Sequence, residues 1–414
     1  AYISGKKKLF IFTLLLFMMI SSCSKKSTEM QTKSATAVPA KQLHIENPMQ
    51  SKETSITDIE QISLAEGEYK QYLVGNQKAY IIILYNPYYG MSVAGGWHHV
   101  RKIYTYDFKT EKLKFKKEFK EKVALVDYIE FEDASYYAII DLKDGEQDTV
   151  KIIKEKDGKQ EVLHTISNDN SSEFRPRFTV SQGILYYFLC DVKAVTGKQD
   201  QFELDQKMIS RKNDNEKTLF TFHAPYYGYN NWSQKEGSFL GTTEMYVQPS
   251  GAILFQEVCP DKQVLHYLIK GKWKAHTVAR DEYVRGYLNE KVILYKKSED
   301  ANYILDLKTE KRKIMNTVPE HIEFSSQLSD NLMYYNGNFE GGKYIWIDVD
   351  GNLKAENANL FEKLNKGKEA MIRIEADHGY VICSLIPTED ETDTTFLSQR
   401  FYHLEYTVQY LTPS

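Results

Sequence analysis

Short runs of apolar and aromatic residues recur along most of the chain, and polar residues typical of turns separate them. Clear examples are Ala79–Tyr85, Ile184–Leu189, Ile253–Phe255 and Val292–Tyr295. Such runs fit strands that are apolar on both faces, because successive side chains of a strand point to opposite faces. The pattern therefore predicts an all-β fold.

Turn-forming residues between these runs predict two families of hairpins that alternate along the chain. The turns of the first family are expected near Asn76, Asp133, Gln182, Ser250, Asn289, Asp330 and Asp377. Those of the second family are expected near Lys109, Asp157, Asp214, Gly271, Lys308 and Asp350. One hairpin of each family makes a four-stranded sheet, so the sequence predicts seven such sheets, the last of them one strand short.

An internal repeat supports this division. Tyr104–Lys112 and Tyr303–Lys311 are identical at six of nine positions, and each runs from a strand through an Asp into a Lys-Thr-Glu-Lys turn. Tyr344–Gly351 has a similar strand with a different turn. Their spacing fits units of about 50 residues, which is in the range of propeller blades.

The missing strand of the last sheet is expected from Ile56–Leu64, paired beside Phe401–Tyr410. This pairing would join the first sheet to the last and leave no open sheet edge. The sequence therefore predicts a seven-bladed β-propeller over residues 56–414. Six or eight blades, two stacked β-sandwiches and a β-solenoid remain alternatives.

Composition narrows the class of protein. The chain has 53 Lys and Arg against 57 Asp and Glu, so its formal net charge of −4 argues against nucleic acid as the partner. Its 22 Gly and 10 Pro are too few for a collagen-like or low-complexity chain. The 30 Tyr and 20 Phe favour strands, because aromatic rings fit a pleated, half-buried surface.

The N-terminal residues have the pattern of a targeting segment. Lys6, Lys7 and Lys8 precede an apolar run, Leu9–Ile20, which is too short to cross a membrane as a helix. The Ile20-Ser21-Ser22-Cys23 sequence that follows resembles the lipobox of bacterial lipoprotein signal peptides. An ordinary cleaved signal peptide with a chance cysteine is the alternative.

The lipobox resemblance implies that residues 1–22 are removed and that Cys23 carries the lipid that anchors the protein to a membrane. Ser24 after the cysteine, rather than Asp, implies an outer-membrane lipoprotein of the bacterial cell envelope, facing either the periplasm or the surface. Residues 24–55 are rich in Ser, Thr, Lys, Gln and Ala, so residues 23–55 are expected to form the anchor and a flexible tether.

One segment resembles a known repeat. In Glu173–Tyr187, Pro176 is followed by an apolar strand, a Ser-Gln-Gly turn and a second apolar strand, as in the TolB-like, WD-repeat-like propellers. Gly183 suits the positive φ angle that a tight hairpin needs. The resemblance implies a β-propeller, and it is clear in this one unit only.

Two long loops carry similar aromatic clusters, and the propeller topology places both at the same face. The predicted binding residues in them are Tyr88, Tyr89 and Trp97 in the first and Tyr226, Tyr227, Tyr229 and Trp232 in the second. Exposed aromatic rings stack on sugar rings or on partner side chains. The alternative is that these rings plug the mouth of the propeller channel or pack between blades.

Arg175 and Arg177 flank Pro176 just before a predicted strand, and their guanidinium groups could bind a carboxylate of a ligand or pair with a neighbouring Glu. His98 and His99 follow Trp97, but adjacent strand residues point to opposite faces, so no shared metal ion is expected. No cofactor is expected either. Cys190, Cys259 and Cys383 are expected to be buried free thiols, with a Cys190–Cys259 bridge as the alternative.

The chain lacks the common nucleotide-binding, zinc-protease and redox motifs. This absence favours a lipid-anchored binding propeller that recognises a glycan, peptide or protein partner through the aromatic loops. A structural subunit of an outer-membrane assembly is one alternative. A seven-bladed polysaccharide lyase is another, and its candidate residues would be Tyr88, His98, His99, Arg175 and His223.

Overall fold

The computed structural model describes the chain in segments. These are residues 50–53, 57–85, 98–142, 149–167, 176–197, 201–227, 241–242, 246–248, 250–258, 263–288, 290–315, 324–327, 332–335, 343–347, 353–357, 370–377, 380–387 and 398–405.

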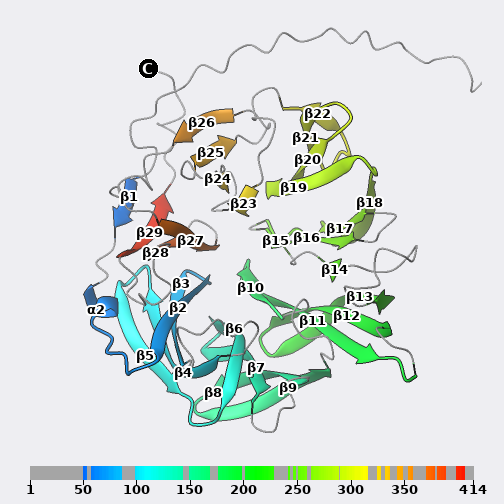
Figure 1. The fold of residues 1–414 in the computed structure, drawn as a ribbon. Helices are drawn as coiled ribbons and strands as arrows, with labels where there is room; N and C mark the ends of the chain where they lie inside the picture. The colour runs from blue at the N-terminus through cyan, green and yellow to red at the C-terminus, as the bar shows by residue number, and fades with distance from the viewer. Residues whose placement is uncertain are drawn as a thin grey trace, which may run out of the picture. The chain divides into compact units, whose positions relative to one another are not determined.

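In these segments the strands group into seven antiparallel meanders, which we number one to seven along the chain (Figure 1). Meander one contains β2 (Glu68–Gly75), β3 (Lys78–Tyr85), β4 (His99–Asp107) and β5 (Lys112–Glu118). Meander two contains β6 (Val123–Phe131), β7 (Ala134–Asp141), β8 (Thr149–Lys156) and β9 (Lys159–Ser167). Meander three contains β10 (Phe178–Ser181), β11 (Ile184–Ala194), β12 (Gln201–Lys212) and β13 (Asn215–Tyr227).

The remaining meanders follow the same order. Meander four contains β14 (Gly241–Thr242), β15 (Tyr246–Val247), β16 (Ile253–Val258), β17 (Gln263–Ile269) and β18 (Lys272–Val278). Meander five contains β19 (Glu282–Leu288), β20 (Lys291–Lys296), β21 (Ala301–Asp306) and β22 (Arg312–Ile314). Meander six contains β23 (Phe324–Gln327), β24 (Leu332–Tyr335), β25 (Lys343–Ile347) and β26 (Leu353–Asn357). Meander seven contains β27 (Ala370–Asp377), β28 (Tyr380–Pro387) and β29 (Ser398–Glu405).

The all-β prediction is confirmed. The described residues are almost entirely strands and turns, apart from the four-residue helix α2 (Thr57–Glu60). Each predicted strand that was named as an example lies within an observed strand. Predicted turns fall between consecutive strands of one meander at Asn76, Asp133, Gln182, Ser250, Lys109, Asp157, Asp214, Gly271 and Lys308, and Asp377 ends β27. Asn289, Asp330 and Asp350 lie outside the described residues.

One prediction about the N-terminus is wrong. Ile56–Leu64 does not pair with the C-terminal strand, because its described part forms α2 and a turn, where Ile59 and Ile62 are buried against meander one. The pairing strand is β1 (Gln50–Glu53), which lies antiparallel to β29. This strand is polar, so an apolar pattern could not reveal it.

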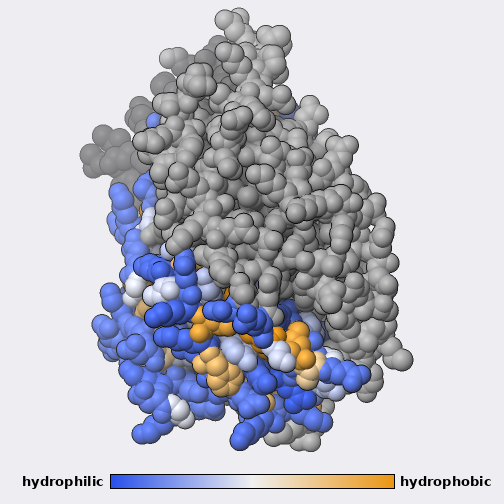
Figure 2. Space-filling model, turned by 90° about the vertical axis from the view of Figure 1, so that its left-hand side faces the viewer, coloured by the Kyte–Doolittle hydropathy of each residue, from blue (hydrophilic) through white to orange (hydrophobic). Residues whose placement is uncertain are grey.

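Successive meanders pack through their apolar faces. One buried cluster joins meanders one, two and three, a second joins three and four, and a third joins four and five. The other face of meander one packs with α2 and with Tyr380 of meander seven. Figure 2 shows that the described surface on the left-hand side of Figure 1 is mostly hydrophilic, with a small apolar group at its middle.

The first strands of the meanders, and in meander four the short strand β15 that pairs with β16, also contact one another. β10 lies against β2, β6 and β15, β19 lies against β23, and β23 lies against β27. β2 in turn contacts β6 and β27, and the Asn76 N–H donates to Asp377 Oδ2 at 3.0 Å. Meanders one and two share a bridge between His99 and Ala124, so their strands form one continuous sheet.

Tight turns join the strands at one end of these meanders. Both residues of six two-residue turns have positive φ, as type I′ hairpins require; the turns are 76–77, 132–133, 157–158, 182–183, 213–214 and 270–271. Gly183, with φ of 66°, adopts the conformation that the sequence predicts. The connections at the opposite end, such as 86–98 and 142–148, are longer, and we call this end the loop end.

The internal repeat forms the same turn twice. Asp107 Oδ1 accepts hydrogen bonds from the N–H groups of Lys109 and Thr110, both at 2.9 Å. Asp306 Oδ1 accepts from Lys308 and Thr309 at the same distances. The matching residues therefore reflect matching local chemistry, in which a carboxylate organises the turn.

Replacing either carboxylate should destabilise its turn to a similar extent. We expect Asp107→Ala and Asp306→Ala each to lower the free energy of unfolding by about 1–2 kcal/mol, because two N–H groups lose their acceptor. Urea unfolding measures the change, with Lys109→Ala, an exposed side chain of the same turn, as the control. If the Asp variants are as stable as this control, the proposed role of the repeat is wrong.

Candidate functional site

The loop end of meander one carries a group of aromatic and basic side chains beside a predicted aromatic loop. We call Tyr69, Tyr85, His98, His99 and Arg101 the loop-end cluster. Tyr69 lies near the start of β2, and Tyr85 ends β3. His98 directly precedes β4, and His99 and Arg101 lie at the start of that strand. Because antiparallel strands alternate in direction, these positions meet at one edge of the sheet.

Two residues of this cluster, Tyr69 and His98, form a tyrosine–histidine pair. The Tyr69 hydroxyl and His98 Nδ1 share a hydrogen bond, and their rings meet edge to face with centroids 5.5 Å apart. Tyr69 also packs against the core shared with meanders two and three. The contact therefore joins a core residue to the residue that follows the 86–97 loop.

In the rest of the cluster, His99 and Arg101 contact Tyr85. The Arg101 guanidinium carbon lies 4.7 Å from the centre of the Tyr85 ring, which is a cation–π arrangement. Tyr85 and His99 face each other across β3 and β4, with ring centroids 6.3 Å apart. Arg101 occupies a β-bulge, since Ile83 pairs with Lys102 and Leu84 pairs with Val100. Bulges re-aim side chains and are frequent beside functional sites.

Both imidazoles favour the neutral form. Burial lowers the pKa of His98. Burial also lowers the pKa of His99, and the positive charges of Arg101 and Lys122 lower it further. A neutral imidazole offers one donor and one acceptor, so at neutral pH the cluster combines polar ring nitrogens, a guanidinium and aromatic faces. This combination suits hydroxyl-rich or anionic ligands.

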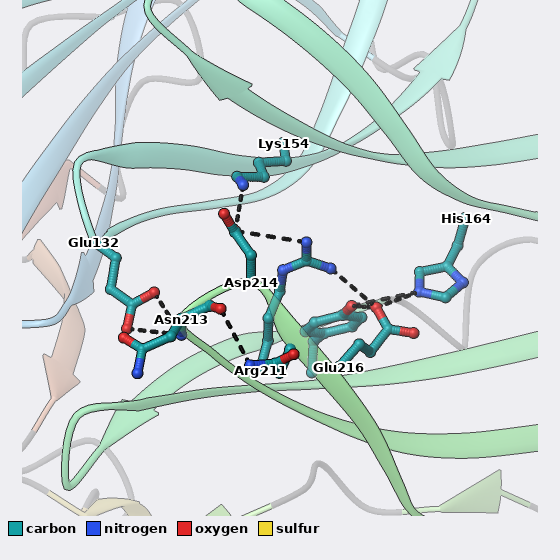
Figure 3. Close-up of polar contacts among 9 residues, drawn as sticks. Glu132, Lys154, His164, Arg211, Asn213, Asp214 and Glu216 are labelled. Carbon is teal, nitrogen blue, oxygen red and sulfur yellow. Dashed lines mark hydrogen bonds and ion pairs between the residues drawn. The ribbon is translucent and has the colours of Figure 1, made fainter.

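A second polar group lies between meanders two and three, and we call it the Arg211 network (Figure 3). Glu216 accepts hydrogen bonds from Tyr187 Oη at 2.6 Å and from Arg211 Nη1 at 3.2 Å. His164 Nε2 lies 3.1 Å from the same carboxylate oxygen. Asp214 pairs with Lys154, so the network connects two sheets at several points.

The contacts of the Arg211 network indicate a structural role. Burial alone would raise the pKa of Glu216, but hydrogen bonds from Tyr187 and His164 hold it below its usual value. Burial and the hydrogen bond to Glu216 raise the pKa of Tyr187. Glu216 is therefore a carboxylate at pH 7, and Tyr187 is a neutral phenol that donates a hydrogen bond to it. The loop-end cluster is the better candidate for a site.

Several predicted site residues lie outside the described residues. These are Cys23, Tyr88, Tyr89, Trp97, Arg175, Tyr229 and Trp232, together with Cys259. Their proposed roles remain predictions from sequence.

The structure places the other predicted residues as follows. Arg177 is half-buried and directly precedes β10. Tyr226 and Tyr227 are predicted to lie in a loop, but their backbone forms the end of β13 and pairs with β12. His98 and His99 enter the loop-end cluster, whereas His223 Nδ1 pairs with Asp205 Oδ1 at 2.7 Å in meander three.

Cys190 is buried and free, so it does not bridge to Cys259. Burial raises the pKa of its thiol to about 12, which makes it an unreactive core residue, as predicted. The backbone of Cys383 lies in β28.

Sequence reasoning missed Tyr69, Tyr85 and Arg101. Tyr85 lies two residues before the Pro87-Tyr88-Tyr89 cluster and Arg101 lies two residues after His99, so their positions were a usable signal. Tyr69 lies 29 residues from its partner His98, and only the folded sheet brings the two together.

Comparisons with known proteins show likeness of structure only. No family model matches the chain, and no curated protein matches it. The β-propeller domain of the Trilobed protease from Pyrococcus furiosus is 10% identical, with a TM-score of 0.45, over 78% of this chain and 93% of that domain. YCF48 bound to a peptide is 9% identical, with a TM-score of 0.41, over 87% of this chain and 97% of that one.

Prolyl oligopeptidase B from Galerina marginata, bound to a macrocyclization substrate, is 12% identical with a TM-score of 0.45. The match covers 82% of this chain but 52% of that enzyme, so the chain spans about half its length. Likenesses at this level carry no inference about activity.

Two further observations concern metal sites and membrane-spanning helices. Within the described ranges, no three His, Cys, Asp or Glu side chains gather in a way that could hold a metal ion. Within the same ranges, no helix is long and apolar enough to cross a membrane.

The structural role of the Arg211 network predicts a pH-dependent effect of Glu216→Gln. The lowered pKa of Glu216 stabilises the fold above the unfolded value near 4.3, and this stabilisation disappears as pH falls through the folded pKa. We expect the variant to be about 1–2 kcal/mol less stable at pH 7, with the difference shrinking below about pH 4.

Urea unfolding of both proteins from pH 7 to pH 3.5 measures this difference. Glu161→Gln, at an exposed position of β9, is the matched control and should show no such trend. A difference that stays constant with pH would contradict the assigned charge of Glu216.

Proposed function

We propose that the chain is a β-propeller of seven four-stranded blades, closed by pairing of β1 with β29, and that it binds a glycan at its loop end. The observation that carries the fold is that the first strands contact one another, with β27 also against β2. In a propeller the first strand of each blade is the innermost, so contacts among first strands are expected.

The proposed binding surface rests on the difference between the two strand ends. One end consists largely of two-residue turns, which offer little variable surface. The loop end bears the longer connections and the loop-end cluster, and binding residues concentrate on such loops. Tyr85 and Arg101 together offer an aromatic face and a planar donor, which suit a sugar ring and its hydroxyl or carboxylate groups.

The proposed location is the bacterial cell envelope, with the protein held in the outer membrane by lipid on Cys23. The support is the Ile20-Ser21-Ser22-Cys23 sequence after a short apolar run. Several acyl chains give stable anchoring, because each buried methylene contributes about 0.8 kcal/mol. The tether then gives the propeller reach to ligands near the membrane.

A glycan array probed with the purified full chain tests the binding proposal. We expect Tyr85→Ala and Arg101→Ala each to weaken glycan binding by about tenfold or more, because a stacking face or a charged donor is lost. Trp97→Ala and Trp232→Ala test the two predicted aromatic loops in the same way.

Lys159→Ala, an exposed cation beside a tight turn at the opposite strand end, is the control and should bind as the unmodified chain does. Binding that is absent from the whole array, or that survives both cluster variants, would rule out the proposed site.

Expression in a Gram-negative bacterium with a radiolabelled fatty acid tests the anchor. We expect the label on the unmodified chain and in the outer-membrane fraction, and none on Cys23→Ala, because the cysteine sulfur and its new amine carry the acyl groups. Mass spectrometry of the N-terminal peptide gives the independent readout. An unlabelled chain cleaved at a different residue would show that the segment is an ordinary signal peptide.

A further inference from the structure

Meander five carries a second arrangement of a guanidinium and aromatic rings. The Arg285 guanidinium carbon lies 5.0 Å from the centre of the Tyr295 ring and 6.0 Å from that of Tyr283. The two tyrosines face each other across β19 and β20, and their rings stack at 6.4 Å and 30°. We call these three residues the Arg285 clamp.

A β-bulge positions the guanidinium. Val284 pairs with Leu294 and Gly286 pairs with Ile293, so Arg285 is the additional residue on β19. A bulge turns its residue away from the regular alternation of the strand, and bulges are frequent beside sites. Arg101 in the loop-end cluster occupies the same kind of bulge and also lies over a tyrosine.

The two rings of the clamp have different surroundings. The Tyr295 hydroxyl donates a hydrogen bond to Asp300 Oδ1 at 2.7 Å, which fixes that ring. Tyr283 is 40% exposed, and it is one of the few large hydrophobic side chains among the described residues that are exposed. A fixed ring therefore supports the guanidinium, while a second ring beside it faces solvent.

Acidic residues close in sequence to the Arg285 clamp hold the local structure together. Glu282 is buried and paired with Arg312. Asp281 accepts a hydrogen bond from Ser298, and Asp300 accepts the bond from Tyr295. A guanidinium has five N–H donors in a planar fork, so Arg285 has capacity for an incoming carboxylate in addition to neighbouring contacts.

We propose that the Arg285 clamp binds a carboxylate-bearing sugar, such as a uronic acid unit of an acidic glycan. Arg285 would hold the carboxylate through paired hydrogen bonds, and the exposed face of Tyr283 would stack on the sugar ring. Cation–π contact with Tyr295 holds the guanidinium in place before the ligand arrives, which lowers the entropy cost of binding. The inference rests on the proposed glycan binding and specifies one of its ligand classes.

Peptides with a free C-terminal carboxylate offer the same charge. The exposed tyrosine face beside the cation favours the sugar, because a pyranose presents a flat set of C–H groups next to its carboxylate. The experiment therefore includes both kinds of ligand.

Isothermal titration of the full chain with trigalacturonate, triguluronate and trimannuronate, with their methyl esters, and with tripeptides that have a free C-terminus tests the proposal. The esters keep the sugar rings but lose the charge. We expect at least one acid to bind. Its methyl ester should bind the unmodified chain about tenfold or more weakly, and the Arg285→Gln variant should bind the acid about tenfold or more weakly. Arg285→Lys should recover part of the affinity, because it keeps the charge but not the planar fork.

Arg280→Gln is the matched control, since this exposed arginine lies just before β19. Tyr283→Ser, at an exposed position, is a second variant in case Arg285→Gln fails to fold as judged by its melting temperature. It should also weaken binding of the acid, through loss of the stacking face.

The outcomes separate the two proposals. Equal binding of acid and ester, or unchanged binding by Arg285→Gln, overturns the Arg285 clamp. Binding of tripeptides with a free C-terminus, and of no uronate, overturns the assignment to sugars. Binding of neutral glycans alone overturns this inference and leaves the proposed function in place, whereas absence of binding to every glycan overturns both.

Discussion

Meanders one and three each have two apolar faces to bury, and a four-stranded meander also has two edges with unpaired backbone groups; these constraints organise the described part of the structure. Meander one buries one face against meanders two and three and the other against α2 and meander seven. Meander three likewise packs on both sides. A single meander of this kind would leave a large apolar surface in water. Its stability therefore depends on its neighbours, as in other repeat architectures.

Much of the fold could be predicted from sequence because its turns depend on local chemistry. Gly183 allows a positive φ, and Asp107 supplies acceptors to the N–H groups of its own turn. The N-terminal pairing strand could not be found this way. Its residues are polar and pair at the edge of a sheet, whereas Ile59 and Ile62 of the Ile56–Leu64 segment are buried against meander one.

The candidate site was only partly predictable for a similar reason. His98 and His99 stood out as adjacent imidazoles, but their tyrosine partners come from β2 and β3, and only strand register brings them together. The bulges at Arg101 and Arg285 depend on how two strands pair, so single-strand patterns do not contain them. The aromatic content of the chain indicated strands, but it did not indicate which rings would support a guanidinium.

The bridge between His99 and Ala124 has a mechanical consequence. It makes meanders one and two a single hydrogen-bonded sheet, while the other described meanders are separate sheets. Two meanders joined by backbone hydrogen bonds resist sliding past each other more than two meanders held by side chains alone. A ligand that contacts His99 would therefore press on a backbone seam between two meanders, and its binding would stiffen both of them together.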